Sequence, residues 1–206
     1  MIRATVTAVG TISRSATVRT SKDGVPFLSF SMTVSIPSTE GAAVPMELSV
    51  SRDGDESMTA DYAAGRRVSV SGVLVPRRSD SNGPVYYNLK ATGCSFECSA
   101  QDSIAGDVMF RGTAGKAIQS HTDRKGNPYF TYSAYSSDRI GANYVFVWMR
   151  FIFFSALPDW FQACCGFDAT GAFEVSVYKD KLDLTCRVKT LEKWEKQVHA
   201  ETESPF

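Results

Sequence analysis

The sequence predicts an all-β protein made of two small five-stranded barrels in tandem. The main observation is a repeat, because a shift of 102 positions aligns Ser21–Ser35 with Asp123–Ser137 without a gap. The matched positions are turn and aromatic residues: Gly24 with Gly126, Pro26 with Pro128, Ser31 with Ser133, Phe27 with Tyr129 and Phe30 with Tyr132. Each copy joins a glycine turn to polar and aromatic residues that alternate with the period of a β-strand. The chain is therefore predicted to contain a duplicated domain.

Length and charge agree with two domains of similar character. The 206 residues are enough for two domains of about 100 residues each. Lys plus Arg and Asp plus Glu number 10 and 9 in residues 1–100, 10 and 9 in residues 101–190, and 2 and 4 in residues 191–206. Both domains are nearly neutral, which argues against a histone-like basic binder. Any electrostatic contact must come from local clusters.

Neither a secretory leader nor a membrane span is expected. The first ten residues lack an apolar stretch after a basic start. Tyr144–Leu157 is the most apolar run, but it is too short to span a bilayer and Arg150 interrupts it. Five cysteines without a paired framework indicate reduced thiols in a cytosol, and Cys94 and Cys98 lack the spacing of zinc ligands. We expect a cytoplasmic protein without a metal or other cofactor.

The first domain is expected over residues 1–100, with five strands and one helix. The helix over Asp55–Ala64 has an acidic first turn and is closed by Gly65. The strands are predicted over Ile2–Ile12, Phe27–Ile36, Glu47–Ser51, Arg67–Val75 and Val85–Lys90. Five strands with one helix between the third and the fourth is the order of an OB-fold barrel.

The second domain is expected over residues 104–190, after a linker over Thr92–Ile104. It repeats the order of the first, with a helix over Pro158–Phe167 that stops at Gly171. Its last three strands are predicted over Trp148–Ser155, Phe173–Tyr178 and Leu182–Val188. Residues 191–206 are expected to form a short amphipathic helix from Leu191, followed by an acidic tail.

The first domain resembles the opening of bacterial single-stranded-DNA-binding proteins. That family carries Val-Gly, a Val-Arg pair, a turn glycine, a strand like F-S-L-A-V, and later a K-G-x-x-V-Y-V-E-G segment. The matching residues are Val9, Gly10, Val18, Arg19, Gly24, Phe30–Val34, Gly65, Val68, Val70 and Gly72. Where the family has a tryptophan and a phenylalanine on the third strand, we align Pro45 and Ser51.

The second domain is similar to the same family in its third strand. Residues 148–155, WMRFIFFS, resemble the family's W-H-R-V-V-L-F-G run. The resemblance implies that Trp148 and Phe154 stack on bases and that Arg150 lies nearby. Strand alternation places Trp148, Arg150, Ile152 and Phe154 on one face, and Phe151 and Phe153 on the other. We interpret the first face as the stacking surface and the second as core.

The candidate site combines aromatic rings that stack on bases with cations that follow phosphates. In the second domain the expected DNA-binding residues are Trp148, Phe154, Arg150, Tyr129, Tyr132, Tyr135, Lys116, Arg124 and Lys125. In the first domain they are Arg14, Arg19, Lys22, Arg77, Arg78 and Tyr87, with Tyr86 as the other candidate ring. The tail resembles the family's protein-docking tip, which implies that Glu201, Glu203, Pro205 and Phe206 bind partner proteins.

The leading hypothesis is a non-enzymatic, sequence-independent single-stranded-DNA-binding protein of replication, recombination or repair. Its two histidines are far apart in the sequence, its carboxylates are scattered through turns, and no phosphate-loop or hydrolase motif occurs. The alternative is an OB-fold subunit that assembles a replication complex and binds little DNA. Family relatives present four OB domains per functional unit, so a chain with two is expected to form a homodimer. A plasmid or phage origin suits this short form as well as a bacterial chromosome does.

Overall fold

The computed structural model describes residues 1–39 and 41–194. It contains ten strands and one short 3₁₀ helix. The elements in chain order are β1 (Ile2–Thr20), β2 (Pro26–Ile36), β3 (Val44–Asp53), η1 (Glu56–Tyr62), β4 (Arg67–Arg78), β5 (Val85–Ser95), β6 (Ser103–Thr122), β7 (Pro128–Ile140), β8 (Asn143–Phe153), β9 (Gly166–Tyr178) and β10 (Lys181–Lys193). The predicted all-β class, with five strands in each half of the chain, is confirmed.

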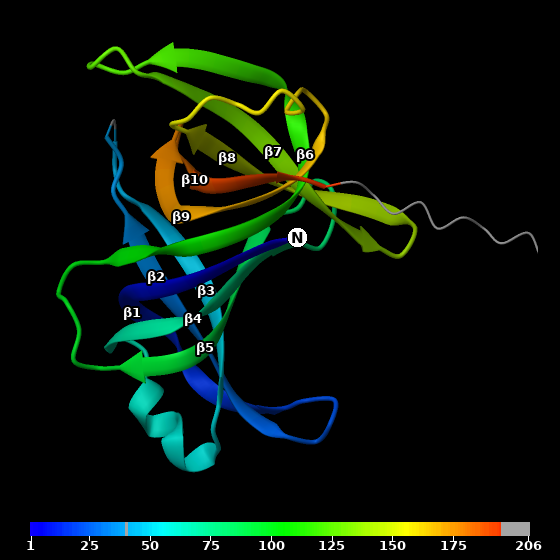
Figure 1. Ribbon diagram of the computed structural model, residues 1–206. Helices are drawn as coiled ribbons and strands as arrows, with labels where there is room; N and C mark the ends of the chain where they lie inside the picture. Colours follow the sequence, from blue (N-terminus) through cyan, green and yellow to red (C-terminus); the bar gives the residue numbers. More distant parts are fainter. Residues whose placement is uncertain (40, 195–206) are drawn as a thin grey trace, which may run out of the picture.

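The strands close into two barrels, seen one above the other in Figure 1. The first barrel, β1–β5, runs in the order β2-β3-β5-β4-β1 and closes through β1 and β2. The second barrel, β6–β10, runs β6-β7-β8-β10-β9 and closes through β6 and β9. Each barrel has one parallel pair, β3 with β5 and β8 with β10, which is the topology of the predicted OB-fold.

The predicted duplication is visible in identical turns before β2 and β7. Gly24 has φ +77° and donates its N–H to the Ser21 carbonyl at 3.1 Å; Gly126 has φ +87° and donates to the Asp123 carbonyl at 3.1 Å. Both turns need a left-handed residue, which glycine adopts without steric cost. Asp123 also accepts N–H groups of Lys125 and Asn127, each at 2.8 Å, and these hydrogen bonds lower the pKa of its carboxyl.

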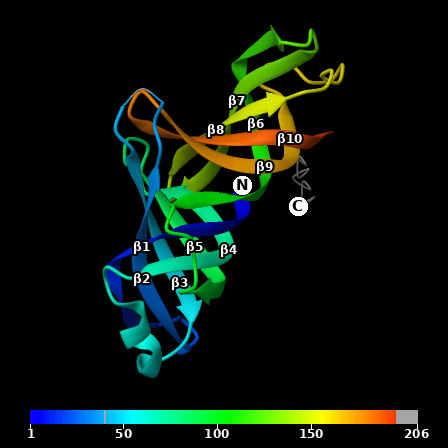
Figure 2. The ribbon, with the colours of Figure 1, turned by 90° about the vertical axis from the view of Figure 1, so that its left-hand side faces the viewer.

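The two barrels are joined edge to edge by their first strands. β1 pairs antiparallel with β6 from Ile2 opposite Phe110 to Val9 opposite Ser103. At the centre of this pairing Thr5 lies opposite Asp107, and these two residues occupy equivalent positions in the two domains, 102 residues apart. The barrels are therefore related by a pseudo-twofold axis through that pair, and ten strands form one continuous sheet (Figure 2).

A glycine in each first strand lets the strand change partners. Up to residue 11 β1 pairs with β4, and from residue 11 onward it pairs with β2. A Cβ at Gly10 would lie 2.3 Å from the Thr33 carbonyl oxygen, and one at Gly112 would lie 2.1 Å from the equivalent oxygen of Tyr135. Because the obstacle is backbone in both barrels, the crossing requires glycine.

Gly10→Ala is expected to lower the free energy of unfolding by about 2–3 kcal/mol, since the new methyl group must displace the β2 backbone. The measurement is urea unfolding followed by circular dichroism. Gly93→Ala is the matched control, because a Cβ there has no neighbour within 4 Å. The two variants having equal unfolding midpoints would contradict this role for Gly10.

The first predicted helix is confirmed in place, although it is a 3₁₀ helix, with Asp55 as its N-cap accepting the Ser57 N–H. The second, over 158–167, is wrong. The segment instead makes two isolated turns, closed by Phe161 N–H to Pro158 and Cys165 N–H to Gln162. Phe161 is buried against Tyr132 and Phe167, as Tyr62 of η1 is against Phe30, so the segment fills the equivalent place in its barrel without forming a helix.

Other boundaries also differ from prediction. β5 continues to Ser95 and β6 starts at Ser103, so the connection is residues 96–102 rather than a linker over 92–104. Gly171 lies inside β9, where a Cβ would meet the Arg187 carbonyl at 2.1 Å; it does not stop a helix. β10 extends to Lys193, so no helix begins at Leu191, and the remaining tail prediction lies outside the described residues. No helix in the described part of the chain is long and apolar enough to cross a membrane.

Candidate nucleic-acid interface

The outer face of β8 carries exposed aromatic side chains. Trp148 is 51% exposed and Arg150 is exposed, whereas Met149 and Phe151 between and beside them are buried. Phe153 is half-buried and packs against the core. The predicted division of this strand into an outer and an inner face is therefore confirmed, and it follows from the two-residue period of a strand.

One end of this face is a row of aromatic side chains, of which only Trp148 and Tyr135 were predicted as site residues. Tyr144 and Phe146 precede Trp148 at two-residue spacing and are also exposed. Tyr135 lies opposite Trp148 on β7, with its ring 5.0 Å from Trp148 and 5.1 Å from Phe146. Rings two residues apart on a strand stand about 6.7 Å from each other.

The other end is a stack of three rings. Tyr129 lies between His121, at 4.9 Å, and Phe154, at 5.5 Å, with interplanar angles of 19° and 28°. His121 Nε2 is 2.8 Å from the Thr131 hydroxyl, which orients the imidazole. Arg124 and Lys125 are exposed on the adjoining β6–β7 turn. The predicted residues Tyr129, Phe154, Arg124 and Lys125 thus belong to one end of the surface.

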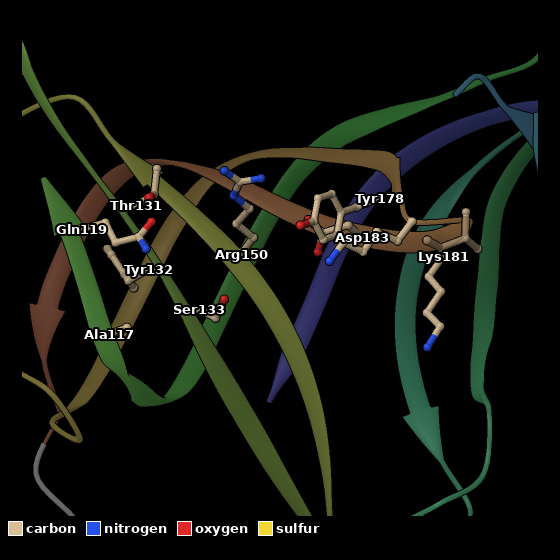
Figure 3. A pocket seen from close by; sticks show the side chains of 11 residues that line it. Ala117, Gln119, Thr131, Tyr132, Ser133, Arg150, Tyr178, Lys181 and Asp183 are labelled. Carbon is tan, nitrogen blue, oxygen red and sulfur yellow. The ribbon is translucent and has the colours of Figure 1, made fainter. Parts of the chain in front are cut away.

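A groove of about 740 Å³ lies between these ends (Figure 3). Arg150 projects into it between Thr131 of β7 and the β9–β10 hairpin. The hairpin adds Tyr178, which is 60% exposed, and Lys179, whose Nζ lies 5.2 Å from the Tyr178 ring centre. A second hollow of about 560 Å³ adjoins it, and there Lys116 lines the same wall as Tyr135 and Trp148. We define the aromatic surface as Tyr129, Tyr135, Phe146, Trp148, Arg150 and Phe154.

Asp183 is the acidic side chain lining this groove. Burial raises the pKa of its carboxyl, and the nearby Arg150 partly offsets that effect. Partial burial of a carboxylate beside a guanidinium makes the groove less repulsive to phosphate than an exposed acid would be. The groove therefore keeps a net excess of cations from Arg150, Lys179 and Lys181.

The prediction that Tyr132 contacts DNA is wrong. Tyr132 is 3% exposed, and its ring lies parallel to Phe151 with centroids 5.1 Å apart. Burial strongly raises the pKa of its hydroxyl. Tyr129 and Tyr135 sit at odd positions of β7 and face outward, so the even-numbered Tyr132 must face the core. Its role is packing beneath the aromatic surface.

The first barrel has a groove of about 630 Å³ at the equivalent place. Arg14, Arg77 and Arg78 line it, as predicted for a phosphate-contacting wall. Of the two candidate rings, Tyr86 is 51% exposed, whereas Tyr87 is half-buried and burial raises the pKa of its hydroxyl. The predicted residues Arg19 and Lys22 are exposed on the β1–β2 hairpin and do not line this groove.

Strand register corrects the sequence alignment of the two third strands. Phe30 pairs with Val50, and its counterpart Tyr132 pairs with Phe151, so β3 and β8 are offset by 101 residues rather than 102. Aligning Pro45 with Trp148 and Ser51 with Phe154 implies an offset of 103 instead, which the strand pairing contradicts. The true counterparts of Trp148 and Phe154 are Glu47 and Asp53.

The exposed rings that were not predicted as site residues differ in how clearly the sequence indicates them. Tyr144 and Phe146 continue the alternation of Trp148 and were identifiable from the strand pattern alone. Tyr178 was not, because its exposure depends on how the β9–β10 hairpin packs. Among the described residues, no group of three or more potential metal ligands gathers in one place.

Solved structures similar to this chain include single-stranded DNA binding proteins. A deletion mutant of the protein from Thermus aquaticus has a TM-score of 0.48 at 14% identity, covering 98% of this chain and 98% of that one. The wild-type Thermus aquaticus protein has 0.48 at 13% identity, covering 95% and 94%. A small protein from Streptomyces coelicolor has 0.36 at 17% identity, covering 46% of this chain and 92% of its own. No protein-family model and no curated protein sequence matches.

Proposed function

We propose that this protein binds single-stranded DNA without sequence preference, mainly through the second barrel. The observation that carries the proposal is the aromatic surface, in which exposed rings occupy a strand face with cations at both ends and in the groove between them. Rings of this kind stack on any base, at roughly 1–3 kcal/mol per base, because every base has a π-face. Duplex DNA hides those faces, so the surface favours unpaired strands.

Near-neutral charge supports stacking rather than phosphate attraction as the main source of affinity. The second barrel balances its cations with acids in several ion pairs away from the groove, including Arg111 with Asp168 and Lys189 with Asp107. Those cations contribute little to a bound strand. The few cations lining the groove predict a shallow salt dependence of binding for a protein of this class.

The experiment that tests this function is tryptophan fluorescence during titration with oligo-dT at moderate salt. We expect quenching, because Trp148 is exposed on the aromatic surface whereas Trp160 is partly buried against Phe161. Trp148→Phe should bind with similar affinity and lose most of the quenching, which assigns the signal. Competition with oligo-rU and with duplex DNA measures the preference for unpaired DNA. Absence of binding to every single strand would leave the interaction-subunit hypothesis as the better one.

The biological setting that we propose is coating of exposed strands in replication, recombination or repair within the cytoplasm. A non-enzymatic binder of this kind protects strands and presents them to other proteins. The acidic segment Glu201–Phe206, outside the described residues, is proposed to recruit those proteins. Its glutamates repel phosphates, and Phe206 beside the stiff Pro205 offers a ring that a partner's apolar pocket can accept.

Deleting Glu201–Phe206 is expected to leave the affinity for oligo-dT equal or slightly tighter, and to abolish capture of replication or repair proteins. The measurement pairs an oligo-dT titration with a pull-down from host extract, using the full chain as the reference. Replacing only Phe206 by alanine separates the ring from the charges. Unchanged capture by the truncated chain would contradict recruitment through this segment.

A homodimer with four barrels remains our proposal for the assembled state. Closed barrels leave only short stretches of strand edge, so such a dimer would have to use side-chain surfaces or the ends of the long hairpins. Light scattering at micromolar concentration is expected to give about twice the 22.5 kDa chain mass. A single-chain mass, with and without oligo-dT, would contradict this assembly.

A further inference from the structure

The pseudo-twofold relation of the barrels makes their grooves comparable position by position. In the second barrel Tyr135 of β7 faces Trp148 of β8; in the first barrel the same two positions hold Thr33 and Glu47, which also face each other. The aromatic pair that lines the hollow beside one groove is therefore replaced by a hydroxyl and a carboxylate in the other barrel, where Glu47 lines the groove. Both sets of side chains point to the outer face of their barrel.

The Glu47 carboxylate is held in place on this face. Its Oε1 accepts a hydrogen bond from the Ser13 hydroxyl at 2.8 Å, and its Oε2 accepts one from the Thr33 hydroxyl at 2.7 Å. Within residues 1–39 and 41–194 it makes no ion pair with a lysine or arginine. Two hydroxyl donors orient the group without neutralising it, so its charge stays in the groove.

We infer that Glu47 closes the first groove to base stacking, so that each chain offers one stacking barrel rather than two. This inference rests on the proposed function and says which half of the chain performs it. A strand entering the first groove finds no ring at the position equivalent to Trp148 and meets the negative charge of Glu47 instead. Loss of one stacking contact alone weakens binding roughly 5- to 150-fold.

The arginines of the same groove oppose this effect and do not overcome it. Arg14, Arg77 and Arg78 attract phosphates, and Tyr86 presents an exposed ring. Arg78 is already engaged, donating to the Ser81 carbonyl at 3.2 Å. Phosphate contacts by surface cations are individually weak and are screened by salt. The groove thus keeps a residual attraction that becomes productive once Glu47 is changed.

The test is calorimetric titration with an oligo-dT of about eight nucleotides, a length that one OB-fold can cover. The wild-type chain is expected to bind one oligonucleotide tightly. Glu47→Gln keeps the size of the side chain and removes its charge, while one of its two acceptor oxygens becomes an NH2 group that can donate to the Ser13 or Thr33 hydroxyl. It should tighten binding of a longer oligo-dT, able to reach both barrels, roughly 2- to 10-fold at low salt. Glu56→Gln removes the same charge from η1, outside the groove, and should leave affinity unchanged.

A double substitution that places the aromatic pair in the first barrel gives a stronger test. The double variant Thr33→Tyr/Glu47→Trp rebuilds the aromatic pair of the second barrel and should raise the stoichiometry to two oligonucleotides per chain. Adding Trp148→Ala to it should leave the new site as the tighter one. No binding to the wild-type chain would refute the proposed function itself. Two equivalent sites in the wild-type chain, or unchanged binding by Glu47→Gln, would overturn the inference while that function stands.

Discussion

Trp148→Ala is expected to weaken the binding of oligo-dT by about 1–3 kcal/mol without unfolding the protein. The side chain is half exposed and sits at the centre of the aromatic surface, between Tyr135 and the hollow lined by Lys116. Removing it deletes a stacking ring and leaves the buried neighbours Met149 and Phe151 in place. The measurement is the fluorescence anisotropy of a labelled oligo-dT titrated with each variant.

Two further variants make this result specific. Met109→Ala removes an exposed apolar side chain from β6 of the same barrel, where it lines neither hollow of the aromatic surface, and should bind like the wild type. Trp148→Phe keeps a ring and should retain most of the affinity. If Trp148→Ala binds as tightly as Met109→Ala, the aromatic surface is not where bases stack.

Phe151→Ala is expected to lower the free energy of unfolding by about 3–5 kcal/mol. Its ring is fully buried, with centroids 4.7 Å from Phe110, 5.1 Å from Tyr132 and 5.4 Å from Phe167. Close packing around it leaves little freedom to refill the cavity. Urea unfolding monitored by circular dichroism measures the loss, and the folded fraction should still bind oligo-dT.

Phe146→Ala is the matched control for this loss, because it makes the same substitution on the same strand with the side chain facing outward. We expect its unfolding free energy to change by less than about 1 kcal/mol. Stability lost equally in both variants would mean that the outer rings of β8 are part of the packed core.

The two faces of β8 have different roles, with stability on the inner face and the proposed DNA binding on the outer face. Residues an odd number of positions apart on β8 face opposite sides, so stability and DNA binding are encoded in interleaved positions. The same division applies to β3, where Met46, Leu48 and Val50 are buried, but there the outer face carries Glu47 and Ser49 instead of rings. Duplication therefore preserved the core pattern of the barrel while the outer face of each copy took a different chemistry.

Much of this protein was determined by local sequence. The repeated glycine turns, the five-strand order of each half and the two faces of residues 148–151 were predicted correctly. Those features depend on the conformation of one residue or on the two-residue period of a strand, which neighbouring residues alone specify. The aromatic row from Tyr144 to Trp148 was present in that pattern as well, although only its last member was chosen.

Tertiary structure decided the features that depend on which strands meet and in what register. Glu47 became the counterpart of Trp148 because the connections after β2 and β7 differ in length. The single ten-stranded sheet follows from the pairing of β1 with β6. Such outcomes depend on packing between residues far apart in the chain, and a one-residue change of register reverses which side chains reach the solvent.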